Sequence, residues 1–327
     1  MAKIYYDCDA DVSLIKDKVV AIIGYGNQGR AQALNMRDSG VESIIVGSRK
    51  DESWDMANED GFKTYSIEKA CEKADIIFLL IPDEIAPTIY KEQIEPNLKA
   101  GNVINFSSGY NITFEFIKPQ KDVDVIMVGP RMIGRGVREM YERGEGFSSF
   151  IAVEQDASGK AQDIALALAK AIGSTKKGAI EVTFKDETYL DLMSEQATWP
   201  LIMAVMNEVY EYLIKEGHPE EAILMELYLS KEPAFMMEKM ADVGLFKQLP
   251  FHSNTSQYGQ LSRFQTVDKE YIKKFIEKQY SNINNGKFAK EWHDEQEKGL
   301  PQLTELKEKA FNSDISLSEK RVKDRLK

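Results

Sequence analysis

The chain has 327 residues, 43% of them hydrophobic and 10% aromatic, so it is long enough for two domains and can build buried cores instead of remaining disordered. Its 42 Lys and Arg against 53 Asp and Glu give a formal charge of −11, which opposes binding to nucleic acid or to an anionic membrane. The longest apolar stretch, about Ile76 to Pro82, is too short to span a bilayer, and the acidic start is unlike a signal peptide. We therefore expect a cytoplasmic protein with a small-molecule substrate.

Cysteine and histidine are scarce. Cys8 and Cys71 are too few for a disulfide framework or a structural zinc site, and the histidines His218, His252 and His293 are widely spaced. Any metal ion must therefore be held by carboxylates.

In residues 18–182, short runs of aliphatic and β-branched residues recur with helix-length segments between them. Because these runs do not alternate with polar residues, we predict strands that helices cover on both faces, hence a mostly parallel, doubly wound sheet. The predicted strands are Val19–Ile23, Ile44–Val46, Ile76–Ile81, Val103–Phe106, Val125–Val128 and Phe150–Val153.

After Phe184 the pattern becomes helical, with apolar residues recurring every three or four positions. One such stripe is Leu190, Met193, Ala197 and Leu201, and another contains Leu224, Leu227 and Tyr228. The sequence thus predicts an α/β domain over residues 1–182 and an all-α domain over residues 183–327. We expect the polar tail after Asn312 to be a frayed, solvated end.

The strongest motif is a glycine-rich turn that follows the first predicted strand and opens a helix. It reads Gly24-Tyr25-Gly26-Asn27-Gln28-Gly29. The first glycine permits the tight turn, the second lets the backbone approach a pyrophosphate, and the third allows close packing of helix on strand. Unpaired N–H groups at the helix start face the phosphates. The alternative is an ordinary glycine turn, but the strand–turn–helix–strand context favours a dinucleotide site.

The end of the next strand bears on which dinucleotide is bound. Arg49 and Lys50, with the hydroxyls of Ser48 and Ser53, could hold a 2′-phosphate, which favours NADPH over NADH. The acidic pair Asp51–Glu52 blurs this signal, and a solvated turn is the alternative.

A pair of acids opens the helical half. Asp191 and Glu195 are four residues apart, so on a helix both carboxylates point from one face. Their apolar surroundings suggest that this face is not open water, and buried like charges need a cation between them. All-oxygen ligands favour Mg²⁺. A solvated helix face is the alternative. The apolar neighbours are Leu190, Leu192, Met193, Trp199 and Pro200.

Several long strings, in order, resemble ketol-acid reductoisomerase, also called acetohydroxyacid isomeroreductase, at the length of the family's short form (class I). The resemblance implies an N-terminal Rossmann domain that binds NAD(P) and a knotted helical C-terminal domain that interlocks with a second subunit. The matching strings are Gly24–Gly40, Ile81–Glu84, Phe106–Ile112, Val123–Pro130, Ala152–Gly159, the segment around Asp191 and Glu195, and Ser253–Gly259.

The family resemblance also implies a reaction. NADPH, with NADH as the alternative, and two Mg²⁺ ions convert 2-acetolactate or 2-aceto-2-hydroxybutyrate, both 2-hydroxy-3-oxo acids, to a 2,3-dihydroxy acid by alkyl migration and reduction, in branched-chain amino acid biosynthesis. Asp191 is then the bridging metal ligand, and Glu195 binds one ion. Glu226 serves the second ion or its waters across the subunit boundary of a homodimer or a larger assembly of dimers. Ser253 matches the substrate-contacting serine.

The resemblance adds Pro82, Asp83 and Gly134 to the predicted cofactor site, and Arg131 to the predicted catalytic residues. Arg131 stands where the family usually has a lysine, so it keeps a positive charge but exchanges no proton at neutral pH.

Two further departures affect the predicted chemistry. The family's Ala-His-Gly-Phe string is here Ser107–Tyr110, with Ser108 in place of the histidine, and its His-Glu pair is here Leu229-Ser230, although Glu232 lies close by. Proton transfer would then need metal-bound water or Glu226. The alternative hypothesis is a divergent paralogue that acts as an NADP-dependent 2-keto acid reductase or as a non-catalytic cofactor-binding protein.

Overall fold

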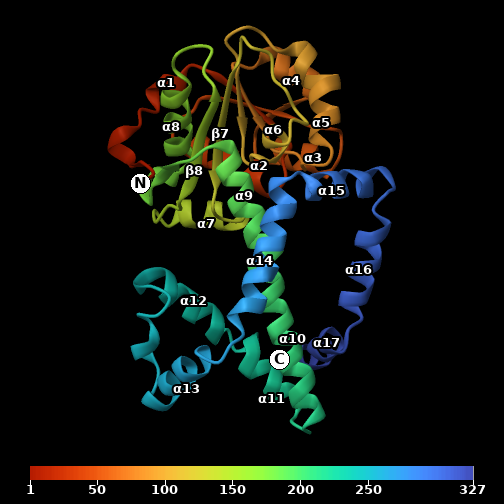
Figure 1. Ribbon diagram of the computed structural model, residues 1–327. Coiled ribbons are helices and arrows are strands. Elements are labelled where there is room, and N and C mark those ends of the chain that lie inside the picture. Colours follow the sequence, from red (N-terminus) through yellow and green to blue (C-terminus); the bar gives the residue numbers. More distant parts are fainter. Residues whose placement is uncertain (327) are drawn as a thin grey trace. The chain divides into compact units, whose positions relative to one another are not determined.

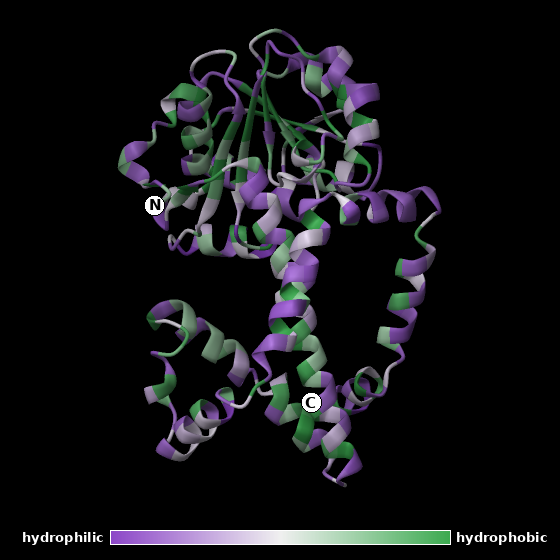
Figure 2. Cartoon of the chain, viewed as in Figure 1, coloured by the Kyte–Doolittle hydropathy of each residue, from purple (hydrophilic) through white to green (hydrophobic). Residues whose placement is uncertain are grey.

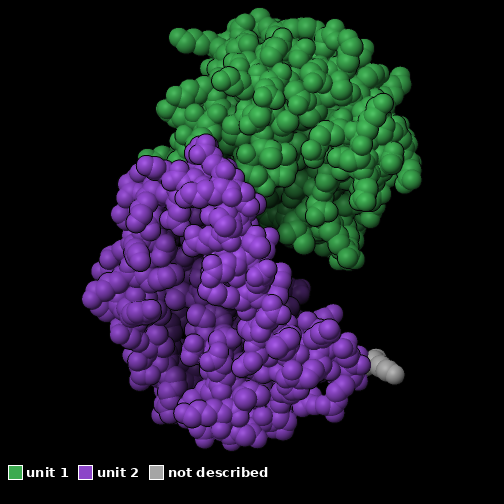
Figure 3. All heavy atoms as spheres, turned by 90° about the vertical axis from the view of Figure 1, so that its right-hand side faces the viewer, with its two compact units in different colours: residues 1–190 green, residues 191–327 purple. Residues whose placement is uncertain are grey.

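The computed structural model describes residues 1–326 and divides into two compact units, which Figure 3 shows in different colours. Unit 1 is Met1–Leu190, and unit 2 begins at Asp191. Helix α9, Phe184–Met193, carries the chain from one unit to the other.

A sheet with helices around it forms the centre of unit 1 (Figure 1). Within the described residues it has nine strands, in the order β1-β9-β8-β7-β6-β5-β2-β3-β4. From β4 to β7 all neighbours are parallel, β8 runs antiparallel to β7, and β1 runs antiparallel to β9. The predicted doubly wound, mostly parallel sheet is confirmed. The strands are β1 Ile4–Tyr5, β2 Val19–Ile23, β3 Ser43–Gly47, β4 Lys63–Tyr65, β5 Ile76–Leu79, β6 Val103–Phe106, β7 Asp124–Pro130, β8 Ser149–Gln155 and β9 Ala179–Glu181.

Each face of the sheet is buried under its own helices, and Figure 2 shows the strands as mostly hydrophobic. Val20 and Ile22 of β2 pack with side chains of α2, α7 and α8, whereas Ala21 and Ile23 pack with those of α4. Burial on both faces is the reason that the strands read as continuous apolar runs. The helices of this unit are α1 Ser13–Lys16, α2 Asn27–Asp38, α3 Glu52–Glu59, α4 Ile67–Lys73, α5 Ala86–Ile89, α6 Tyr110–Thr113, α7 Gly134–Glu142 and α8 Ala161–Ile172.

Unit 2 is helical, as predicted. No helix in the described part of the chain is long and apolar enough to cross a membrane.

Two π-helical turns, η5 Ser194–Thr198 and η6 Met225–Leu229, interrupt the helices of unit 2. The α-helices of unit 2 are α10 Trp199–Lys215, α11 Glu220–Leu224, α12 Glu232–Val243, α13 Asn254–Phe264, α14 Lys269–Asn284, α15 Lys287–Glu297, α16 Pro301–Phe311 and α17 Asp314–Arg325.

The prediction of a frayed C-terminal tail is wrong, because α17 is a packed helix. Val322 is buried, with 1% of its surface exposed, against the cluster around Leu224. The Ser318 hydroxyl donates to Glu220 Oε2 at 2.5 Å, and Arg321 forms an ion pair with the same carboxylate. The helix is polar except for this one face, so composition alone suggested a solvated end.

The two apolar stripes predicted for the helical half differ in outcome. Leu224 is fully buried and packs with Leu227 and Tyr228, as expected. Of the other stripe only Ala197 is buried, and Leu190 is 55% exposed. Unit 2 exposes many further large apolar side chains on α10, α12 and α13, namely Trp199, Met203, Val205, Val209, Tyr212, Phe235, Met237, Val243, Tyr258, Leu261 and Phe264.

Candidate functional site

The glycine-rich turn connects β2 to α2. Gly24 has a φ of +94°, a conformation that side chains disfavour, and a Cβ there would lie 2.7 Å from the Leu80 carbonyl oxygen. A Cβ on Gly29 would lie 2.0 Å from the Gly24 carbonyl oxygen, so α2 can approach the strand only without a side chain at this position. Gly26 has nothing within 4 Å of its Cβ position, which leaves the backbone open to a ligand.

A cavity of about 690 Å³ opens over this turn. Gly24, Tyr25, Gly26, Asn27 and Gln28 form one side, and Pro82 lies in the loop after β5. The loop after β3 contributes Ser48 and Arg49, and the first turn of α3 contributes Ser53. The remaining predicted cofactor residues, Gly29, Lys50, Asp83 and Gly134, do not line this cavity. Asp83 instead accepts a hydrogen bond from Asn111 Nδ2 at 2.9 Å.

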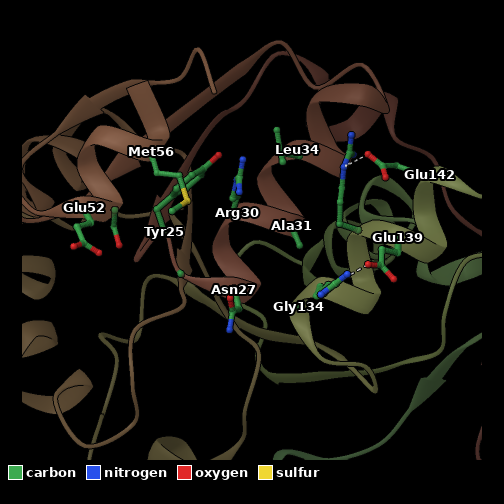
Figure 4. Close-up of a pocket in the computed structure, with 14 residues that line it drawn as sticks. Tyr25, Asn27, Arg30, Ala31, Leu34, Glu52, Met56, Gly134, Glu139 and Glu142 are labelled. Carbon is green, nitrogen blue, oxygen red and sulfur yellow. Dashed lines mark hydrogen bonds and ion pairs between the residues drawn. The ribbon is translucent and has the colours of Figure 1, made fainter. Parts of the chain in front are cut away.

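A second cavity, of about 600 Å³, continues across α2 between α3 and α7 (Figure 4). It shares Tyr25, Gly26, Asn27 and Ser53 with the first, and Gly134 opens its α7 side. We call the two together the cofactor cleft. The first turns of α2, α3 and α7 all line it, and helix N-termini favour anions because their N–H groups are unpaired. The cleft therefore fits a large, phosphate-bearing ligand.

Tyr25 is held in the turn by a hydrogen bond to Asp60, which forms an ion pair with Arg30. Its hydroxyl donates to Asp60 Oδ2 at 2.8 Å, and Arg30 holds both oxygens of that carboxylate, at 2.7 and 3.0 Å. The hydrogen bonds from Arg30 lower the pKa of Asp60, and burial raises the pKa of Tyr25. Tyr25 is 1% exposed, so this contact holds the glycine turn to the end of α3.

The loop after β3 contributes one cation to the lining of the cleft, Arg49. Its side chain is 79% exposed, and its Nε lies 3.9 Å from Asp51 Oδ2. Asp51 also caps α3 by accepting the N–H groups of Ser53 and Trp54. Lys50 turns away, with its ammonium 6.0 Å from the centre of the Trp54 ring.

A buried carboxylate joins the ends of β6 and β7 to α9. Glu187 is 1% exposed and accepts hydrogen bonds from the Gly109 N–H at 2.6 Å and from Arg131 Nη2 at 2.9 Å. Arg131 Nε donates to the Gly129 carbonyl, and its guanidinium lies 4.8 Å from the centre of the Phe150 ring. Arg131 is thus a fixed positive charge at the carboxyl ends of the strands.

Close packing explains the glycine in this arrangement. A Cβ on Gly109 would lie 2.4 Å from the Phe184 carbonyl oxygen and 2.6 Å from Thr188 Oγ1. The first turn of α9 can therefore approach the loop after β6 only because position 109 has no side chain.

On the loop after β6, neither Ser108 nor Tyr110 replaces the absent histidine as a proton carrier at neutral pH. The Ser108 hydroxyl accepts the Tyr110 N–H at 3.3 Å. Burial raises the pKa of Tyr110, so its phenol stays protonated at neutral pH.

The predicted metal ligands lie in unit 2, and all three are exposed. Asp191 is on the last part of α9, Glu195 is in the π-helical turn η5, and Glu226 is in the π-helical turn η6. Such turns occur frequently at functional sites. Within residues 1–326, no three His, Cys, Asp or Glu side chains gather as a metal site would require. One chain therefore does not bring Glu226 to the other two acids.

The apolar surroundings expected around the acid pair are only partly present. Leu192 and Ala197 are buried, but Leu190 and Trp199 are about half exposed. Ser253, the predicted substrate contact, is exposed and caps α13 by accepting the Ser256 N–H at 3.3 Å.

Sequence reasoning missed three residues that organise the site: Glu187, Asp60 and Gln32. Glu187 carried a signal, since it precedes Asp191 by four residues just as Asp191 precedes Glu195. Asp60 carried none, because its partners Tyr25 and Arg30 are distant in sequence. Gln32 carried none for its bond to Ser107, which is 75 residues away.

Two family models match most of the chain. Residues 14–178 match the acetohydroxy acid isomeroreductase, NADPH-binding domain, and residues 184–327 match the ketol-acid reductoisomerase, C-terminal domain. Relatives named ketol-acid reductoisomerase (NADP(+)) from Methanocaldococcus jannaschii and Pyrobaculum aerophilum are 44% and 43% identical, over 94% and 95% of this chain and 93% and 94% of their own lengths. A solved structure of an NADH-preferring ketol-acid reductoisomerase from an uncultured archean matches with a TM-score of 0.93 and 37% identity over 98% of both chains.

Proposed function

Because this chain belongs to the ketol-acid reductoisomerase family, whose curated relatives are NADP-dependent enzymes, we propose that it acts on 2-acetolactate or 2-aceto-2-hydroxybutyrate. An alkyl group moves from C2 to C3 of the 2-hydroxy-3-oxo acid, which leaves a ketone at C2. Hydride from the nicotinamide then reduces that ketone to give the 2,3-dihydroxy acid. The product belongs to branched-chain amino acid biosynthesis.

One observation carries this proposal: α9 bears Glu187, clamped by Gly109 and Arg131 at the carboxyl ends of the strands, and Asp191 follows one turn later on the same helix. In an open α/β sheet, ligands bind beyond the carboxyl ends of the strands. A helix that begins there and continues with acids at four-residue spacing suits a reaction that needs both a nicotinamide and a cation.

The cofactor is NADP(H), and we propose that NADPH is preferred to NADH. Arg49, which lines the cleft with Ser48 and Ser53, supports this preference because a guanidinium pairs well with a 2′-phosphate. Asp51 opposes it, since a carboxylate accepts ribose hydroxyls and repels phosphate. A 37% identical solved structure is of an NADH-preferring enzyme, so members of the family differ in preference. We propose that the balance between Arg49 and Asp51 sets the preference of this chain for NADPH over NADH.

We propose Asp191, Glu195 and a second copy's Glu226 as ligands of two Mg²⁺ ions. The donor set fits in kind, because all three are carboxylates and Mg²⁺ prefers oxygen. It fits in number only if another copy contributes, because one chain gathers no three-acid group among its described residues. When bound, the ions supply Lewis-acid stabilisation of the oxygens that gain charge as the alkyl group moves.

Arg131 and Glu226 take the remaining proposed roles. Arg131, held by Glu187, keeps a permanent positive charge that can orient an anionic substrate but cannot relay a proton. The proton of the C2 hydroxyl therefore leaves to a carboxylate, and we assign this step to Glu226, with Ser253 contacting the substrate. No group on the loop after β6 competes, since Ser108 and Tyr110 stay protonated at neutral pH.

We propose that the second copy docks on unit 2. Many large apolar side chains of α10, α12 and α13 are exposed, and exposed apolar surface favours association with a partner. A homodimer through this surface, or a larger assembly of dimers, covers it and supplies the Glu226 that one chain lacks at its own acid pair. The family's knotted, interlocking helical domain is the expected form of this dimer.

A second candidate function is reduction without alkyl migration. It is favoured by the locked Arg131, by Ser108 and by Ser230, which caps the Glu232 N–H where the family has a second glutamate. Such an enzyme would reduce a 2-keto acid with NADPH and would not convert 2-acetolactate by methyl migration.

The test is NADPH oxidation with 2-acetolactate and, in parallel, with 3-hydroxy-3-methyl-2-oxobutanoate, the product of migration. Both reactions are run with Mg²⁺ and with excess chelator. We expect both substrates to be consumed and both rates to fall on chelation. Turnover of the 2-keto acid alone would support the reductase, and turnover of neither would contradict both functions.

A further inference from the structure

A relay of side-chain hydrogen bonds runs from the cofactor turn to the strand end that carries Arg131. Gln28 Nε2 donates to the Met132 carbonyl at 2.9 Å, and Gln28 Oε1 accepts from Gln32 Nε2 at 3.0 Å. Gln32 Nε2 also donates to Ser107 Oγ at 3.3 Å, and that hydroxyl donates to the Val128 carbonyl at 3.2 Å.

Donor and acceptor counting allows one orientation of this relay. The amide nitrogen of Gln28 must face Met132, because a carbonyl oxygen can only accept. Gln28 therefore offers its own oxygen to Gln32, whose two N–H groups divide between Gln28 and Ser107. The Ser107 hydroxyl has one proton, and it goes to Val128. Turning either amide over would place two oxygens together.

The centre of the relay, at Gln32, is protected from water, whereas Gln28 and Ser107 are partly exposed. Gln32 is 0% exposed, so solvent cannot replace the bonds of its amide nitrogen. Its Oε1 has no hydrogen-bond partner among the described residues, so the side chain is held by its two donated bonds alone. Loss of either bond leaves a buried N–H of Gln32 unpaired, which costs free energy and therefore favours the intact relay.

The two carbonyls that the relay holds lie on either side of Arg131. Val128 is three residues before it, and Met132 follows it directly. The backbone ladder between β6 and β7 ends at the pair Phe106 and Met127, so the Ser107 hydroxyl continues that pairing by one further bond. Residues 128–132 are thus fastened at both ends to α2.

We propose that Ser107 and Gln32 are positioning residues that fix the segment 128–132, and through it the guanidinium of Arg131, relative to the dinucleotide turn. Neither residue touches the reacting atoms in this proposal. The proposal rests on the proposed function, because it takes Arg131 as a group that meets the substrate.

The test uses Ser107→Ala, Gln32→Met and the double variant in the full chain, with Ser107→Thr as the conservative replacement. The matched control is Ser149→Ala. Ser149 is also fully buried, on β8 opposite Pro130, but its hydroxyl has no partner among the described residues and belongs to no relay. The measurements are kcat with 2-acetolactate and the Kd for NADPH.

Each single variant should lower kcat about tenfold, which corresponds to a rise of about 1.4 kcal/mol in the activation free energy. The Kd for NADPH should stay within about twofold of the wild-type value. The double variant should be no slower than the slower single, because either change opens the same relay. Ser107→Thr should restore the rate, and Ser149→Ala should match wild type. A double variant slowed about 100-fold, or a control as slow as Ser107→Ala, would overturn the proposal.

A second measurement keeps the relay testable if wild type does not turn over, which would be a failure of the proposed function alone. Amide hydrogen exchange of peptides that cover residues 128–132 should quicken in each single variant, quicken no further in the double, and stay unchanged in Ser149→Ala. Additive changes, or no change in either single variant, would show that the relay does not hold this segment.

Discussion

The Glu187 clamp gives a prediction whose size can be worked from its contacts. Glu187→Ala removes two hydrogen bonds to a buried carboxylate, from Gly109 and Arg131. Hydrogen bonds to charged groups contribute about 1.5–3 kcal/mol each. Two such bonds give about 3–6 kcal/mol, and because Arg131 is 26% exposed and can be partly rehydrated, the expected loss is at the lower end, about 3–4 kcal/mol. Glu187→Gln should lose less, since its single oxygen can still satisfy one of the two donors.

Hydrogen exchange of the β6 and β7 amides measures this loss as a fall in their opening free energy. The matched control is Glu139→Gln, which breaks the pair of Glu139 with Arg135, a residue that is 85% exposed. That change should cost below about 1 kcal/mol, as surface pairs do. Equal effects of Glu187→Ala and Glu139→Gln would refute the claim that the clamp holds the strand ends.

Arg49→Ala should weaken NADPH more than NADH in a binding titration, while Lys50→Ala should change neither much, because Arg49 lines the cleft and Lys50 does not; equal losses for both cofactors on Arg49→Ala would contradict the assignment. Asp191→Asn should lower the isomerisation rate by on the order of 10³-fold or more with the thermal melt unchanged, and a retained rate would remove the metal role. Co-expressed Asp191→Ala and Glu226→Ala subunits should regain activity, whereas no recovery at any ratio would indicate a site within one chain. Arg321 lowers the pKa of Glu220 to about 2, so this carboxylate stabilises α17 fully above about pH 4.5 and loses that contribution as the pH falls toward 2. Hydrogen exchange of α17 should quicken over that range in wild type, and Glu220→Gln should abolish most of the dependence.

The sheet was predictable because its strands are buried on both faces, so their sequences are continuous apolar runs that need no partner to be recognised. β1, β4 and β9 were not found, because runs of two or three residues carry no periodicity. The direction of β8 was also not readable, since strand pairing is decided by the path of the chain and not by the strand's own residues.

In the site, local features could be predicted from the sequence, whereas contacts between distant residues could not. The glycine turn could be predicted because Gly24 and Gly29 are each required by local steric contacts and Gly26 keeps the backbone open. The Arg131 and Glu187 pair joins residues 56 apart, and the bond from Gln32 to Ser107 spans 75, so neither leaves a local pattern. The acid pair of Asp191 and Glu195 was visible, but its surroundings were not, because Leu190 and Trp199 remain exposed in one chain.

The most direct test of the central claim is the connectivity of the product formed from 2-acetolactate with NADPH and Mg²⁺. Carbon-13 NMR of product made from labelled substrate distinguishes the two outcomes, which have the same formula. Our account predicts 2,3-dihydroxy-3-methylbutanoate, with both methyl groups on C3, and no product after chelation. Formation of 2,3-dihydroxy-2-methylbutanoate, in which the methyl group has stayed on C2, would show reduction without migration and contradict it.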